Sequence, residues 1–150
     1  MYPFPTDHFV MSDPDAPTGM KVSISEKALP RNKEGVTVNM YGVYPSDGFS
    51  QIPAIQIALP VLPADGQMYG PHDDPTPTTK GEGPTVLIDV ETGEKILHFA
   101  EIASSTGTRH MMAIRPLVPL RPEARHVVAI RTMNDDDGQP LALPDGFATL

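Results

Sequence analysis

The residues that come nearest in type and spacing to a metal site form an acidic loop near the end of the chain. This acidic loop consists of Asn134, Asp135, Asp136, Asp137 and Gly138. Ca²⁺ takes about six to eight oxygen ligands, and three consecutive carboxylates beside a turn-forming glycine can supply some of them. The EF-hand spacing does not fit, because with Gly138 at its sixth position the first and twelfth positions fall on Met133 and Pro144. Two interpretations stay open: an Asx turn that needs no ion, and a Ca²⁺ site that ligands from elsewhere complete.

A serine near a histidine is the second pattern that can do chemistry. Ser104 and Ser105 precede His110, with Gly107 between them. A histidine within hydrogen-bonding reach of a serine hydroxyl can act as its general base. The serines of the chain all lie outside the G-x-S-x-G elbow that α/β-hydrolases use. The sequence therefore favours a polar hairpin loop at 104–110 and keeps a hydrolytic site as the alternative.

The histidines show no zinc-binding pattern, because none of them pair at ligand spacing and the H-E-x-x-H motif is absent. His72 with Asp73 and Asp74 is the one local group of a histidine with carboxylates. It lies in a proline-rich loop, where adjacent side chains rarely converge on one ion. His98 alternates with apolar neighbours on a predicted strand, which predicts that it points away from the core when they point in.

Composition excludes several classes of partner. A formal net charge of −8 argues against nucleic acid, whose phosphates attract Lys and Arg, and against anionic membrane surfaces. No run approaches the ~20 apolar residues of a membrane helix. The N-terminus lacks the charged and apolar regions of a signal peptide, so Met1 is interpreted as a maturation boundary or a plain start. The absence of cysteine excludes disulfides and thiolate metal sites.

The elements that must position these residues are short strands. Eighteen prolines and twelve glycines divide the chain into short pieces, and several segments alternate with period 2 while none keeps an apolar repeat of 3.6 residues. The predicted strands are 20–25, 36–44, 52–59, 85–89, 96–102, 111–114 and 126–131, with a last one that begins at Phe147. Residues 85–102 predict a hairpin around the turn VETGEK, with Gly93 at positive φ. The pattern predicts an antiparallel β-sandwich with less than about a tenth of its residues in α-helix.

Two regions differ in character. Residues 1–48 are loop-like and rich in proline, which predicts an N-terminal extension packed on the core. Residues 49–150 carry the stronger strand signals and form the predicted sandwich. Within this sandwich, residues 63–84 are too polar and too rich in Pro and Gly to pack, so they predict a long surface loop that is mobile or functional.

The closing segment LRPEARHVVAIRTMNDDDGQPLALPDGFATL (120–150) resembles the last strands of bacterial Ig-like modules. In those modules a Leu-x-Pro strand with Tyr or His before its Val precedes an Asp-rich loop and a final Phe-led strand. Upstream, the pieces YPFPTDHF, PTGMKV, SDGFSQIP and DVETGEKILHFAE are similar to the N-terminal region of secreted bacterial lipase-like and esterase-like proteins, in which an Ig-like region precedes an α/β-hydrolase domain. The resemblance covers about half of the chain. It implies an all-β, Ig-like fold in an exported protein, whether periplasmic, cell-surface or extracellular. His126 stands where such strands more often carry Tyr, and no hydrolase domain lies within these residues.

The expected function is therefore a non-catalytic Ig-like accessory or interaction module of an exported bacterial protein that adjoins an α/β-hydrolase domain. Its expected partner is another protein or the adjoining domain, and its expected contact surface is an edge strand, with Pro53 and Pro60 limiting unwanted pairing. No cofactor is expected apart from Ca²⁺ at Asp135, Asp136 and Asp137. The alternative is a ligand-binding or hydrolytic enzyme whose site combines the 63–84 and 104–110 loops.

Overall fold

The computed structural model describes residues 2–142 and 144–148. The chain divides into two compact units: a smaller unit, Pro5–Ser50, and a larger unit, Gln51–Leu150 together with Met1–Phe4. The sequence placed residues 2–4 in the extension, whereas Phe4 forms a β-bridge with Gln56 of the larger unit. That the extension packs on the core stays a prediction.

The smaller unit contains one short antiparallel pair of strands. Its elements are η1 (Asp7–Phe9), β1 (Val10–Ser12), β2 (Met20–Val22), η2 (Glu26–Ala28) and α1 (Met40–Val43), where η marks a 3-10 turn. β1 and β2 pair with Val10 opposite Val22. Among the described side chains of this unit, Val22 is the buried hydrophobic one. The unit therefore has little core of its own.

The strand predicted at 36–44 is wrong. This segment forms only an isolated bridge between Thr37 and Arg31 before the helix α1. The Asn32 side-chain oxygen accepts hydrogen bonds from the backbone N–H groups of Glu34 and Val36, at 3.0 and 2.9 Å. An asparagine that bonds the backbone in this way stabilises a turn in place of a continuous strand.

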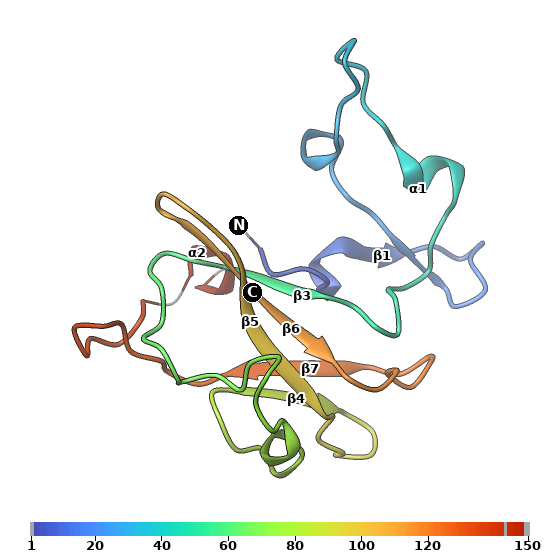
Figure 1. Ribbon diagram of the computed structural model, residues 1–150. Helices are drawn as coiled ribbons and strands as arrows, with labels where there is room; N and C mark the ends of the chain where they lie inside the picture. Colours follow the sequence, from blue (N-terminus) through green and yellow to red (C-terminus); the bar gives the residue numbers. More distant parts are fainter. Residues whose placement is uncertain (1, 143, 149–150) are drawn as a thin grey trace. The chain divides into compact units, whose positions relative to one another are not determined.

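The larger unit contains two antiparallel sheets (Figure 1). The first has the strand order β3-β6-β5, and the second pairs β4 with β7. The strands are β3 (Ile55–Leu59), β4 (Thr85–Asp89), β5 (His98–Thr106), β6 (Arg109–Pro116) and β7 (His126–Ile130). The helical elements are η3 (Thr76–Lys80) and α2 (Asp145–Ala148). The all-β prediction is confirmed, because every strand pairs antiparallel and the α-helices of the described residues have four residues each.

Both sheets contribute to one hydrophobic core. Its buried members are Ile55, Ile57, Leu59, Leu87, Ile96, Ala100, Met112, Ile114, Leu120 and Met133. Val128 and Ile130 of β7 are half-buried and pack against them. No helix of the described residues is long and apolar enough to cross a membrane.

The predicted hairpin at 85–102 is correct in its turn and wrong in its strand pairing. Gly93 has φ 72°, as the turn requires. After the turn, however, only residues 94–96 pair with β4, through the bridge between Ile88 and Lys95. The chain then enters the other sheet, where β5 pairs with β6, and β4 pairs with β7. Sequence alternation marks both strands but does not specify their partners.

The prediction that His98 points away from the core is also wrong. His98 is fully buried, whereas its neighbours Leu97 and Phe99 are only half-buried. Its ring is satisfied inside the protein, because Nε2 lies 3.0 Å from the Thr85 hydroxyl and Nδ1 lies 2.7 Å from the carbonyl oxygen of Ile96. A buried polar side chain with both nitrogens bonded carries little desolvation penalty.

The C-terminal strand predicted to begin at Phe147 is absent from the described residues. Phe147 lies in the helix α2 and packs against the core. The remainder of that predicted strand, residues 149–150, lies outside the described residues.

Candidate functional site

The 63–84 loop is packed against the rest of the larger unit, contrary to the expectation that it is too polar to pack. Thr78 is 1% exposed, and its hydroxyl oxygen lies 3.3 Å from the donating backbone N–H of His98. The backbone N–H of Ala100 donates to the Tyr69 carbonyl oxygen at 2.8 Å. Backbone and hydroxyl groups therefore anchor the loop to the first residues of β5.

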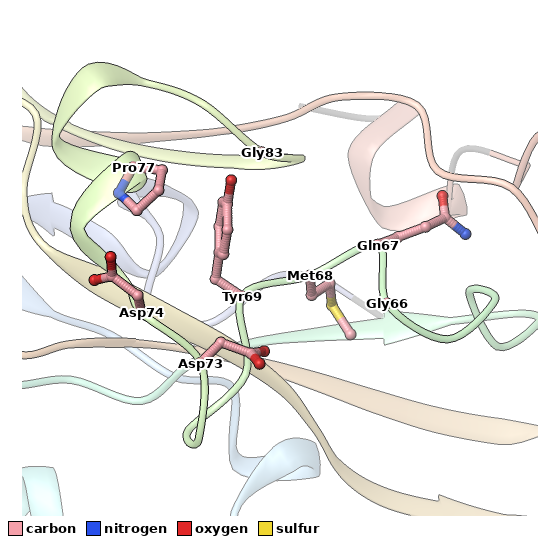
Figure 2. Close-up of a pocket in the computed structure, with 8 residues that line it drawn as sticks. All are labelled: Gly66, Gln67, Met68, Tyr69, Asp73, Asp74, Pro77 and Gly83. Atoms are coloured by element: carbon pink, nitrogen blue, oxygen red, sulfur yellow. The ribbon is translucent and has the colours of Figure 1, made fainter.

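A recess of about 390 Å³ lies on this loop, and Figure 2 shows its walls. It is lined by Gly66, Gln67, Met68, Tyr69, Asp73, Asp74, Pro77 and Gly83. Gly83, at φ 84°, allows the Tyr69 ring to approach closely, because a Cβ atom there would lie 2.7 Å from a ring carbon. The recess is thus shaped by backbone packing around one aromatic ring.

The carboxylates of this recess serve the loop itself. Asp73 accepts the backbone N–H of Gly70 at 2.7 Å, and Asp74 accepts that of Thr76 at 3.0 Å. A hydrogen bond from the Thr76 side chain, together with the one from its backbone, holds the pKa of Asp74 below its ordinary value. The two carboxylates point in different directions (Figure 2), and His72 is not among the lining residues. The local group of His72 with two aspartates does not converge on one point.

The acidic loop 134–138 forms a turn through its own atoms. One carboxylate oxygen of Asp135 accepts the backbone N–H groups of Asp137 and Gln139, at 3.0 and 2.8 Å. Gly138 has φ 74°, and its N–H donates to the Asp135 carbonyl oxygen at 3.0 Å. In the described chain no three His, Asp or Glu side chains are grouped so that they could hold a metal ion. The Ca²⁺ site at Asp135, Asp136 and Asp137 stays a prediction.

The structure brings Ser105 and His110 together. The serine hydroxyl lies 2.8 Å from His110 Nδ1, and the two residues are directly opposite each other on β5 and β6. Ser104 is opposite Met111 instead, after a register shift that follows Ile102. Within the described residues no carboxylate bonds the other nitrogen of His110, and Ser105 is exposed.

The two loops of the alternative enzyme site contact different parts of β5. The 63–84 loop bonds His98 and Ala100 at its start, whereas Ser105 lies five residues beyond Ala100, about 16 Å along an extended strand. The described contacts therefore do not combine the two loops into one site.

The last residue of β4, Asp89, is a buried carboxylate that pairs with the partly exposed Arg121, a contact that sequence analysis did not predict. The Asp89 side chain is 3% exposed and accepts Arg121 Nε at 2.8 Å. It also accepts the backbone N–H groups of Glu91 and Thr92, at 2.9 and 3.2 Å. The hydrogen bond from Arg121 holds the pKa of Asp89 far below its ordinary value, and Asp89 and Glu91 in turn raise the pKa of Arg121. No local motif indicates this contact, because 32 positions separate its partners.

His126 adds a second potential cation to this pair. Its Nε2 lies 3.7 Å from Asp89 Oδ2 and is buried without a hydrogen-bond partner. The 3.7 Å separation is too long for a hydrogen bond, so the contact with Asp89 is electrostatic only and exists only for a protonated ring.

On one side of β7 the backbone N–H and C=O groups have no partner strand among the described residues. The N–H of Val90 donates to the Arg125 carbonyl oxygen at 3.0 Å, and that of Arg131 donates to the Pro84 carbonyl oxygen at 2.7 Å. Arg125 and Arg131 flank β7 and lie six residues apart. In an antiparallel ladder, hydrogen-bonded and non-hydrogen-bonded pairs alternate. These two bonds therefore define which positions of β7 face β4.

Between those bonds, Val127 and Ala129 direct their backbone groups toward β4. His126, Val128 and Ile130 direct theirs to the opposite side. Among the described residues no backbone hydrogen bond reaches that side of β7. We call these outward N–H and C=O groups of His126, Val128 and Ile130 the open edge.

The outer strands of the other sheet are each bonded at one outward position. On β3, Gln56 exchanges two backbone hydrogen bonds with Phe4, at 3.0 and 2.7 Å. On β5, Ala100 is bonded to the Tyr69 carbonyl oxygen. On β7, by contrast, none of the three outward positions has a backbone partner among the described residues.

Comparison with known proteins adds no assignment: no family model, no curated protein and no solved structure matches the chain.

Proposed function

We propose that the chain is a non-catalytic Ig-like accessory or interaction module of an exported bacterial protein, adjoining an α/β-hydrolase domain, and that it binds its partner by strand addition. The observation that carries the proposal is the open edge of β7. An unpaired strand edge offers a row of donors and acceptors to another extended chain. Two antiparallel sheets around a common core support the sandwich architecture, and the resemblance of residues 120–150 supports the exported context.

The test uses the backbone donor of Val128, because it lies at the centre of the open edge. A phage-displayed library of extended peptides is selected against the wild-type protein, and the enriched peptides are measured against Val128→Pro. Proline removes the outward N–H and leaves the bonds of Val127 and Ala129 to β4 in place. We expect enriched peptides that lose roughly tenfold or more in affinity on this variant.

Val128→Thr is the matched control, because it changes the half-buried side chain and keeps the N–H. Peptides should bind this variant nearly as well as the wild type, once circular dichroism shows that both variants are folded. A library that yields no binders, or binders indifferent to Val128→Pro, would contradict strand addition at β7.

A second candidate function, ester hydrolysis, has one specific observation in its favour: the 2.8 Å contact between the Ser105 hydroxyl and His110. In this reaction the imidazole takes the hydroxyl proton as the serine oxygen attacks the ester carbonyl. The assay is turnover of short-chain p-nitrophenyl esters. Loss of turnover in Ser105→Ala but not in Ser104→Ala would favour the enzyme over the non-catalytic module.

A further inference from the structure

The side chains that flank the open edge have a definite charge pattern. Arg125, Val127, Ala129 and Arg131 follow one another at every second position and are all exposed. In a strand such alternate residues project from the same face of the sheet. The solvent face of β7 thus carries two small apolar residues between two arginines.

A docked strand would place its own side chains against these four. Its backbone would bond His126, Val128 and Ile130, so the residues opposite Val127 and Ala129 would form non-hydrogen-bonded pairs. In such pairs the side chains of an antiparallel ladder approach most closely. Residues opposite Arg125 and Arg131 would also form non-hydrogen-bonded pairs. A charge on such a residue would therefore lie close to the guanidinium group and attract or repel it.

We infer that the open edge of β7 selects an extended strand with acidic residues opposite Arg125 and Arg131 and apolar residues opposite Val127 and Ala129. The inference rests on the proposed strand addition and adds the chemistry of the partner. Arg131 already donates to the carbonyl oxygens of Gly81 and Gly83. A guanidinium carries five N–H donors, so donors remain for a carboxylate.

The same pattern disfavours a second copy of this chain as the occupant. A two-fold axis through Val128 would pair β7 with itself in antiparallel register. Arg125 of one copy would then lie opposite Arg131 of the other, and like charges directly opposite each other destabilise a pair of strands. The net charge of −8 opposes an acidic partner only at long range, because salt at physiological strength screens exposed charges beyond about 8 Å.

The experiment uses three synthetic peptides that differ only at their ends: Glu-Thr-Val-Thr-Val-Thr-Glu, and the same sequence with Gln or with Lys in place of both Glu. Each reads the same in both directions, so either strand orientation brings the end residues opposite the arginines. Fluorescence anisotropy at physiological ionic strength measures their affinity for the intact chain. We expect the Glu peptide to bind about fivefold more tightly than the Gln peptide, and the Lys peptide to bind most weakly.

Charge reversal on the protein provides the control. Arg125→Glu should reduce or invert the preference for the Glu peptide, whereas Arg109→Glu, the same change on the exposed start of β6, should leave it unchanged. Equal binding of the three peptides, lost in Val128→Pro, would overturn the charge selection and keep strand addition. Binding of none of them, together with an unproductive library, would overturn both. A dimer in sedimentation analysis that Val128→Pro dissociates would identify a second copy as the occupant and overturn the inference.

Discussion

The two outer sides of the β4–β7 sheet differ in how their backbone is bonded. Beside β4, the N–H of Ile96 donates to the Leu87 carbonyl oxygen at 2.8 Å, and the N–H of Asp89 donates to the Glu94 carbonyl oxygen at 3.0 Å. Beside β7, the corresponding groups meet no other backbone of the described chain. β4 is followed at once by a tight turn that returns along it, and such a return closes an edge locally. β7 has no such return, and its outward groups stay available to another chain.

Hydrogen exchange of the unmodified protein tests this comparison directly and should show the largest effect. The amides of Val127 and Ala129 are bonded to β4, whereas those of Val128 and Ile130 belong to the open edge. We expect the outward amides to exchange faster, on the order of a thousandfold, because bonded amides must wait for opening of the sheet. Uniform protection along β7 in NMR exchange spectra would show that the edge is closed.

The closed side of the sheet depends on Asp89, whose replacement should have the largest effect on stability. Asp89→Asn keeps one acceptor for the turn but leaves Arg121 without its buried counter-charge. We expect the melting temperature to fall by about 5 °C, because the buried carboxylate loses its charge-assisted hydrogen bonds from Arg121, which is itself partly exposed. Glu91→Gln is the matched control, since Glu91 bonds the same arginine from an exposed position. A similar loss in both variants would contradict the special role of Asp89.

Acid should weaken the same contact in the wild-type protein. The folded-state pKa of Asp89 lies below its ordinary value of 3.8, so the unfolded chain takes up the proton at a higher pH than the folded chain. The stability that this carboxylate contributes is therefore complete above about pH 4 and is lost as the pH falls toward the folded-state pKa. Asp13 and Asp74 also have lowered pKa values, so Asp89→Asn should remove only part of the dependence. Identical acid melting profiles of wild type and variant would contradict the prediction.

The anchor of the 63–84 loop on β5 depends on one hydroxyl group, that of Thr78. The Thr78 hydroxyl accepts the N–H of His98 and donates to the Pro75 carbonyl oxygen at 2.7 Å. Thr78→Val keeps the shape and leaves a buried donor unsatisfied, which costs about 1–3 kcal/mol. Thr79→Val is the control, because the Thr79 hydroxyl bonds Thr76 at an exposed position. Equal urea midpoints for the two variants would show that the loop anchor contributes little.

The sequence correctly predicted the features that depend on nearby residues. Alternation identified β4 and β7, and the glycine of the turn VETGEK identified Gly93 as a residue at positive φ. It failed where distant residues decide the outcome. His98 was assigned to the wrong face because alternation treats histidine as polar, whereas Thr85 satisfies its ring inside the core.

The open edge itself was predicted only as a general property of edge strands. Pro53 and Pro60 pointed to β3, where Phe4 in fact pairs with the strand. Locating the open edge on β7 required the register of β4 and β7, which long-range packing determines and no local pattern encodes.

The smallest effect is expected from Ca²⁺ at the acidic loop, which begins four residues after β7 ends. A ligand that binds only the folded state raises the melting temperature by mass action. Asp135 already directs one carboxylate oxygen at two backbone N–H groups, so the turn forms without an ion, and millimolar Ca²⁺ should change the melting temperature by less than about 1 °C relative to chelator. A larger rise that Asp136→Asn or Asp137→Asn abolishes would instead assign the loop to Ca²⁺. It would also sharpen the comparison between the two sides of the sheet. The strand with the open edge would then lead into a loop that binds an ion, whereas the closed edge depends on the pair of Asp89 and Arg121.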